Sequence, residues 1–480
     1  MTDDYVSRTN RNRLSRVPLS RRQLLTGLGG AALALSTTAL TGCTITKGEP
    51  PISTLGLSKD PAKRPNGRPR AHNLSMYSLW GATVGQGLVA VAQEFEAANP
   101  DIGVGITFAP ASGTVQQKLL TAVAGHEPPD IAQVVPLQTP QWAALGIMTD
   151  LTDWFERDGL SLDDYFAPAA EAMTYNDRVY SMNWDADPNF PLFWNKDLFE
   201  QSGLDPEKPP TTIEEVDEFN AKILKRDGGM ATKVGLTPWD NYGFSNSIFT
   251  WGFAFGGRFR TPGTDDVTPD DEYVVKALEW ICESAKKVGG PDAVSIAPPS
   301  LALHSFSTGN LGMAPLVSSN LKDIVAAVPD LKFGSTLLPY GPPGGSKPGQ
   351  GAWIGGWSAF IPTRAKEPEA AWEFIKWWSS TDAGTTSSWK NVGFPVSYKK
   401  SSSLALVKED PIMQAYYDTL VNSTNTRPPV LVADFFTQQL ETEVAKAVYG
   451  QETPLQALRN VKAATDAETK RFKREIRSGR

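Results

Sequence analysis

The sequence predicts an α/β fold in which helices cover a largely parallel sheet. The first observation is that short runs typical of strands alternate with segments of helical apolar spacing, beginning at residues 73–80 and 84–98. The second is that this alternation continues to residue 135, and right-handed crossovers between such strands make them parallel. The third is a similar alternation that starts near residue 234. The chain, with 480 residues, is long enough for two or more domains with full cores.

The first half of the pattern is compact enough to suggest where a ligand would bind. Ligand sites in parallel sheets lie in the loops beyond the carboxyl ends of the strands. Those loops fall here at 80–87, 110–114 and 136–140. The elements that define them are strands at 73–80, 104–108 and 129–135, with helices at 84–98 and 114–124 between them.

The second half contains a clear helix start. Thr212 and Glu215 have the spacing of a capping box, for a helix that runs to about residue 225. The elements that follow are strands at 234–236 and 311–315 and helices at 244–255, 273–287, 369–379, 436–449 and 454–471. The C-terminal third is therefore mainly helical.

The N-terminal segment indicates where the protein works. Six arginines make this segment basic, and the pair Arg21-Arg22 precedes a short apolar run that ends in Leu-Thr-Gly at Cys43. The run is too short and too rich in glycine for a stable membrane span. The segment resembles a twin-arginine export signal ending in a lipobox, although a simple basic arm is the alternative. The resemblance implies that residues 1–42 are removed and that Cys43 carries fatty acyl chains (palmitate), which anchor the protein to the outer face of a bacterial membrane. Residues 43–70, rich in proline, lysine and glycine, are then a flexible tether.

Composition excludes several classes of partner. Removing residues 1–42, with their six arginines and two aspartates, takes the net charge from −7 to −11. Such an acidic protein does not suit nucleic acid, which needs concentrated positive charge. Cys282 has no second cysteine to pair with once Cys43 carries lipid. The three histidines are widely scattered, so we expect no metal site, and nothing in the sequence indicates a cofactor.

Several sequence blocks resemble the bacterial extracellular solute-binding proteins of ABC importers, the group that contains maltose-binding protein. The blocks lie in the same order as in that family and extend over most of the chain from residue 73. They are NPDI at 99–102, PDI at 129–131, WAALGIMTDL at 142–151, FWNKDLF at 193–199, FSTGNLGM at 306–313, GGWSAFIP at 355–362 and AAWEFIKW at 370–377.

The resemblance implies a type II clamshell of two α/β lobes, each with a mixed, largely parallel sheet. The chain would cross between the lobes near residues 184–190, 353–359 and 425–431. Gly355-Gly356 would give one crossing the freedom to rotate, although glycines also simply punctuate loops. The expected parts are lobe 1 at 71–186 and 353–427, and lobe 2 at 187–352 and 428–480.

The candidate ligand site combines flat aromatic rings with hydrogen-bonding side chains, which suit the faces and hydroxyls of a sugar. Fourteen tryptophans are present, several of them beside glycine, asparagine or aspartate, although core packing is an equal expectation for most of them. Loop positions and the resemblance together select Trp80, Thr83, Ser112, Gln117, Gln138, Asp185, Trp239, Asp240, Asn241, Ser319, Asn320, Trp353, Trp357 and Trp389.

The resemblance implies that the protein captures a monosaccharide or oligosaccharide and delivers it to the permease of an ABC importer. We expect a monomer without enzymatic activity. A polyamine or a peptide is the alternative ligand. A surface sensor, an adhesin or a secreted glycoside hydrolase is the alternative from another class, although no pair of carboxylates lies in a hydrolase-like signature.

Overall fold

The computed structural model describes residues 67–108, 113–294, 303–341 and 347–478. All of these belong to one compact unit. The expected export signal, Cys43 and nearly all of the expected tether lie outside the described residues. Among those that are described, no helix is both long and apolar enough to cross a bilayer.

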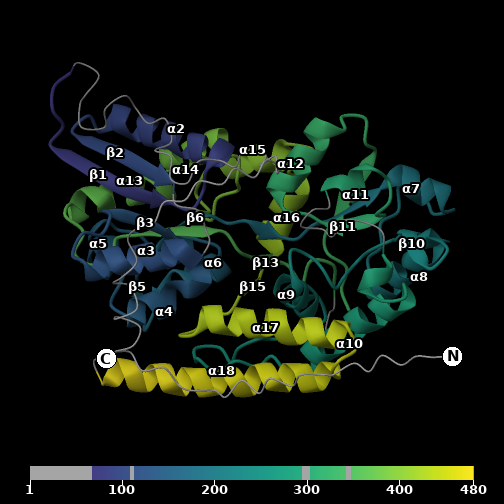
Figure 1. The fold of residues 1–480 in the computed structure, drawn as a ribbon. Coiled ribbons are helices and arrows are strands. Elements are labelled where there is room, and N and C mark those ends of the chain that lie inside the picture. The colour runs from purple at the N-terminus through teal and green to yellow at the C-terminus, as the bar shows by residue number, and fades with distance from the viewer. Residues whose placement is uncertain (1–66, 109–112, 295–302, 342–346, 479–480) are drawn as a thin grey trace, which may run out of the picture. The chain divides into compact units, whose positions relative to one another are not determined.

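The larger sheet has five strands in the order β2-β1-β3-β14-β6 (Figure 1). β1 runs parallel to both β2 and β3, as the alternation predicted. β14, from much later in the chain, lies antiparallel between β3 and β6. The strands are β1 (His72–Ser78), β2 (Ile102–Phe108), β3 (Ile131–Val134), β6 (Met182–Asp185) and β14 (Trp357–Phe360).

Helices from both ends of the sequence build the core around this sheet. Apolar side chains on one face of α2 are buried, and Phe95 packs edge-on against Phe374 of α13, with 5.0 Å between the ring centroids. Trp184 of β6 stacks on Trp378 in the same core. The helices and short strands of this part are α2 (Ala82–Ala98), α3 (Gly113–Ala124), η1 (Pro136–Gln138), α4 (Thr139–Ala144), α5 (Thr152–Arg157), η2 (Leu162–Asp164), α6 (Ala167–Ala172), β4 (Thr174–Tyr175), β5 (Arg178–Val179), α13 (Pro368–Ser380) and α14 (Asp382–Asn391).

The second sheet has three strands, with β8 (Leu192–Asn195) between β11 (Met313–Pro315) and β12 (Phe333–Thr336). Both neighbours run antiparallel to β8. The expectation of a largely parallel sheet here is therefore wrong. Alternating strands and helices predict parallel pairing between successive strands, whereas β8 pairs with segments more than a hundred residues away. The strand predicted at 234–236 is reduced to a single bridge between Val234 and Leu311.

The remaining elements surround the second sheet and the C-terminus. The predicted capping box at Thr212 and Glu215 is confirmed, since each side chain bonds the other's backbone N–H. The elements are α7 (Lys196–Gln201), α8 (Ile213–Ile223), β9 (Lys225–Asp227), β10 (Met230–Lys233), α9 (Phe244–Ala254), α10 (Glu272–Lys287), η3 (Pro291–Ala293), α11 (Leu303–Ser307), α12 (Ser318–Ala327), α15 (Ser403–Glu409), α16 (Gln414–Asn422), α17 (Ala433–Val448) and α18 (Pro454–Arg477).

A third small sheet joins the three segments that were expected to cross between lobes. β13 (Trp353–Ile354) pairs antiparallel with β7 (Pro188–Asn189) and parallel with β15 (Asn425–Thr426). Segments far apart in the sequence therefore lie side by side at the centre of the fold (Figure 1). The lobe boundaries stay predictions, but the three crossing segments are neighbours.

Candidate ligand-binding site

Three of the predicted site residues meet at one edge of the five-stranded sheet. Trp80 follows β1, and its ring lies edge-on against Trp357, with 5.2 Å between the centroids. Trp357 opens β14 and pairs across the ladder with Asp185, the last residue of β6. The indole Nε1 of Trp80 is buried and has no partner among the described residues. This edge therefore offers an aromatic face and an unused donor.

Two carboxylates, one buried and one half-buried, follow directly from this edge. Asp185 is 1% exposed, and its Oδ1 accepts a hydrogen bond of 2.9 Å from the backbone N–H of Asp187. Burial and the nearby Asp187 carboxylate raise the pKa of Asp185 well above its usual value. Burial also raises the pKa of Asp187. Burial and the closeness of the two carboxyl groups therefore disfavour the charged form of both.

A half-buried arginine lies beside these carboxylates. The charge of Arg427, which follows β15, acts on Asp187 and lowers the pKa of that carboxyl against the effect of burial. The guanidinium lies 5.3 Å above the ring of Trp353, and burial lowers the pKa of Arg427 to about 10. Its Nε has no partner in the described part of the chain. The crossing segments therefore bring together two aspartates and one arginine.

Aromatic and amide side chains extend the site toward the second sheet. Phe190 stacks on Tyr242, with 5.5 Å between centroids and 9° between the planes. The Tyr242 hydroxyl donates to Asn320 Oδ1 at 2.6 Å. Its neighbour Asn241 is 1% exposed, yet neither polar atom of its side chain has a partner within the described ranges. A buried amide without partners is costly, so a ligand or water would satisfy it.

These contacts form one unbroken series, which we call the aspartate site. The Trp80 and Trp357 rings touch, and Trp357 pairs with Asp185. The series continues through the backbone N–H of Asp187, which bonds Asp185, and through Asn189, whose amide donates to the Asp187 carbonyl at 2.6 Å. The next residues in order are Phe190, Tyr242 and Asn320. The site therefore links the edge of the large sheet to the N-terminal end of α12 through the crossing segment.

Gly356 explains how the chain passes so close to this site. Its φ is +84°, and an added Cβ would lie 1.8 Å from the Asp185 carbonyl oxygen. The sequence suggested hinge rotation or loop punctuation for Gly355-Gly356. Close approach of two backbones is a third and sufficient reason for glycine at 356.

Acidic groups continue on the side of α9. Asp240 accepts a hydrogen bond of 3.2 Å from the Gly243 N–H, and burial raises the pKa of its carboxyl. Glu441 of α17 accepts hydrogen bonds from the backbone N–H groups of Phe244 and Ser245, at 3.1 and 2.8 Å, at the start of α9. The neighbourhood of Asn241 is therefore acidic, with no basic side chain in these contacts.

The other predicted site residues lie elsewhere or have partners already. Trp239 is 5% exposed inside the apolar core that contains β8 and α9. Trp353 adjoins the site, because its ring lies edge-on against Phe190, but its Nε1 already donates to Thr250 Oγ1 at 3.3 Å. Gln138 donates to Asp434 Oδ1 at 2.5 Å. Trp389 packs under the Lys322 ammonium, 5.1 Å from the ring centroid. Thr83 is exposed and Ser319 is half-buried; Ser112 and the side chain of Gln117 lie outside the described residues. The ligand roles of all these residues stay predictions.

Sequence reasoning missed five members of this neighbourhood: Asp187, Asn189, Phe190, Tyr242 and Arg427. Asp187 and Phe190 lie within a predicted crossing, and Arg427 lies in another. Asp187 and Arg427 could have been predicted, because a charged side chain in a segment expected to lie between the lobes is a candidate ligand contact. Tyr242 directly follows three predicted site residues, but nothing local distinguishes its ring from a core tyrosine.

Comparison with known proteins places this geometry in context. Residues 81–385 match the family described as bacterial extracellular solute-binding protein. The sn-glycerol-3-phosphate-binding periplasmic protein UgpB of Shigella flexneri serotype 5b is 26% identical over 288 residues, 58% of this chain and 63% of that protein. Its counterpart in Escherichia coli strain K12 gives the same values. The chain thus matches under two thirds of the length of these relatives, which are binding proteins by name.

Solved structures of binding proteins share the fold. CpMnBP1 with mannotriose bound superimposes with a TM-score of 0.70 at 25% identity, covering 82% of this chain and 99% of that one. A sugar-binding protein MalE from Xanthomonas citri gives 0.68 at 19% identity, with 85% and 100% covered. The predicted type II periplasmic-binding-protein fold is confirmed by these likenesses.

Proposed function

The chain belongs to the bacterial extracellular solute-binding proteins, and from this premise we propose that it captures a neutral carbohydrate at the aspartate site for an ABC importer. The ligand is a monosaccharide or an oligosaccharide bound between two lobes that the crossing segments connect. Binding favours the closed arrangement of the lobes in proportion to the ligand's preference for it. A separate permease then receives the sugar.

One observation carries the proposal: aromatic rings and unsatisfied polar groups occur together along the aspartate site. The half-buried Trp80, Trp357 and Tyr242 rings provide apolar faces for the C–H groups of a sugar, and the buried Phe190 ring supports Tyr242 from behind. Trp80 Nε1 and the amide of Asn241 are buried without partners among the described residues. Sugar hydroxyls donate and accept, so they can satisfy both kinds of group.

The charges of the site bear on the class of ligand. The curated relatives are named for glycerol 3-phosphate, an anion. Here Asp185, Asp187 and Asp240 are buried or half-buried, and the charge of Arg427 acts on Asp187 alone of the three. An uncharged ligand avoids the repulsion that a phosphate would meet. The same acidity favours a polyamine as the second candidate.

The address of the protein follows from its N-terminal segment. The arginine pair and the Leu-Thr-Gly-Cys sequence support export and lipid attachment at Cys43. The protein would then work as a monomer on the extracytoplasmic face of a bacterial membrane, with its lobes held by a tether of residues 43–70. Labelling with a fatty acid analogue, and its loss in Cys43→Ser, tests this part separately.

The binding proposal is tested by thermal shift with the full chain. The panel contains mannotriose, maltose, spermidine and glycerol 3-phosphate. A ligand at a hundredfold excess over Kd adds about 2.7 kcal/mol of stability and raises the Tm. We expect a sugar to do so and Asn241→Ala to abolish the shift. A shift with spermidine alone would transfer the proposal to the polyamine, and a shift with glycerol 3-phosphate alone would contradict it.

A further inference from the structure

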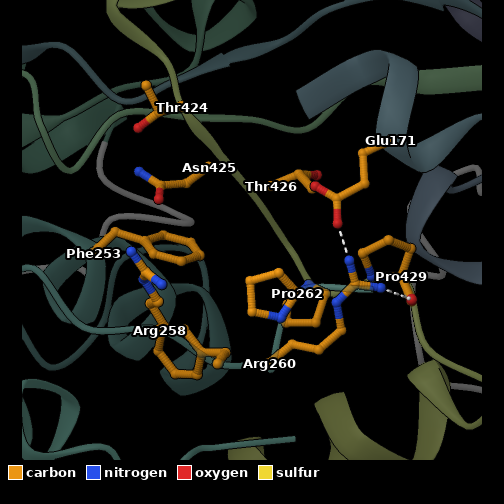
Figure 2. Close-up of a pocket in the computed structure, with 11 residues that line it drawn as sticks. Glu171, Phe253, Arg258, Arg260, Pro262, Thr424, Asn425, Thr426 and Pro429 are labelled. Carbon is orange, nitrogen blue, oxygen red and sulfur yellow. Dashed lines mark hydrogen bonds and ion pairs between the residues drawn. The ribbon is translucent and has the colours of Figure 1, made fainter. Parts of the chain in front are cut away.

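A polar cavity of about 350 Å³ lies among α6, the loop after α9 and the segment that contains β15 (Figure 2). We call it the arginine pocket. It includes no member of the aspartate site. Its polar lining comes from Glu171, Arg258, Arg260 and Asn425, and its apolar lining from Phe253 and three prolines.

One arginine of this pocket is already engaged. The Arg260 guanidinium forms an ion pair with Glu171 and donates to the Pro429 carbonyl at 2.8 Å (Figure 2). Its side chain is 15% exposed, and burial lowers its pKa. Three separate segments are therefore joined through a single guanidinium.

The other arginine is available. Arg258 is exposed, and its guanidinium makes no hydrogen bond or ion pair with any residue that the structure describes. It lines the same cavity as the Phe253 ring, on the side away from Glu171 (Figure 2). The lining carries two arginines against one glutamate, so the cavity is left with one uncompensated positive charge.

We propose that the arginine pocket is a second binding site, for a small oxyanion that carries a carboxylate or phosphate group. A guanidinium presents a planar fork of N–H donors that matches the oxygens of such groups. Arg258 supplies this fork, and the Phe253 and proline walls reduce competition from water. The proposal is independent of the sugar proposal, because the two sites share no side chain.

Glu171 sets the affinity of this site. Its carboxylate occupies the fork of Arg260 that a bound anion would otherwise use. An incoming oxyanion therefore competes with Glu171 for one arginine while it binds the other. Glu171 precedes the first crossing segment in the sequence and Arg260 follows it. Binding of an anion in the pocket would therefore weaken an ion pair between the parts of the chain before and after that segment.

The test is isothermal titration calorimetry of the full chain with inorganic phosphate and with citrate, at constant ionic strength. We expect at least one of them to bind, and Arg258→Gln to weaken binding at least about tenfold. Arg459→Gln on the exposed face of α18 is the matched control and should bind as the native protein does. Glu171→Gln should strengthen binding, because it frees Arg260.

Two results would overturn the proposal. One is the absence of binding by the native chain with either anion. The other is equal weakening in Arg258→Gln and Arg459→Gln, which would mean that the anions respond only to net charge. Unchanged Tm values in all three variants establish that the comparison is made between folded proteins.

Discussion

The aspartate site adjoins the first two crossing segments and the arginine pocket adjoins the third, and the two hold charge in opposite ways. At the aspartate site Asp185 is buried, Asp187 is half-buried, and several polar atoms lack partners among the described residues. At the arginine pocket Arg258 is exposed, and the half-buried guanidinium of Arg260 is paired with Glu171. The first arrangement costs stability in the free protein, whereas the second costs little. The fold therefore places its most costly buried polar groups in the region where the ligand is expected to bind.

The largest expected effect comes from a substitution in the backbone next to the aspartate site. Gly356→Ala would place a Cβ 1.8 Å from the Asp185 carbonyl oxygen at a φ of +84°. We expect a loss of about 3 kcal/mol or more in the free energy of unfolding, measured by urea denaturation. Gly146→Ala is the control, because its φ is also positive at +68° but nothing lies within 4 Å of the added atom. It should lose only about 1–2 kcal/mol, and equal losses would contradict the close-approach argument.

Replacing the buried carboxylate of Asp185 should give the next largest change in the free energy of unfolding, and this change should be a gain in stability. Because the pKa of Asp185 is raised in the folded state, folding favours its protonated form, and this contribution to stability is lost as pH rises above 3.8. Asp185→Asn should therefore be about 1–3 kcal/mol more stable than the native chain at pH 7.

The gain of Asp185→Asn should shrink as the pH falls toward 3.8, and Asp163→Asn, an exposed aspartate, should show no such trend. Urea denaturation across this pH range measures both. A variant less stable than the native chain at pH 7 would contradict the prediction, because it would mean that the charged carboxylate stabilises the folded state.

The arginine pocket should give the smallest effect. The Glu171–Arg260 pair joins side chains that are 47% and 15% exposed, so solvent screens it in part. A double-mutant cycle with Glu171→Gln and Arg260→Gln should yield a coupling of at most about 1 kcal/mol, measured by urea denaturation. A coupling above 2 kcal/mol would contradict the difference drawn between the two sites, because the ion pair of the pocket would then contribute strongly to the stability of the fold.

Local patterns in the sequence predicted much of the fold but not its pairing. The strands at 73–80 and 104–108 and the cap at Thr212 follow from neighbouring residues, and all are found. The antiparallel character of the second sheet depends on which distant segments meet β8. No periodicity within a strand carries that information.

The candidate site also contains residues that the sequence predicted and residues that only contacts between distant segments bring there. Trp80 was predicted because it follows a strand, and Asp185 and Trp357 were predicted because they lie at expected crossings between lobes. The structure brings all three together at one end of the large sheet. Tyr242 and Arg427 become part of the site through contacts with Phe190 and Trp353, which lie far away in the sequence. Trp239 looked like a site residue from its polar neighbours, but its large ring is packed in the core.

The place of β14 in the large sheet has a consequence for how the protein is made. β14 completes the sheet between β3 and β6, but it is synthesised only after the whole of the second sheet. Until then β3 has an open edge and β6 has no neighbouring strand in this sheet, and open edges invite pairing with other chains. The large sheet therefore closes late, through contacts of high sequence separation, which slow folding. Partly synthesised chains should accordingly be the form most in need of protection from aggregation.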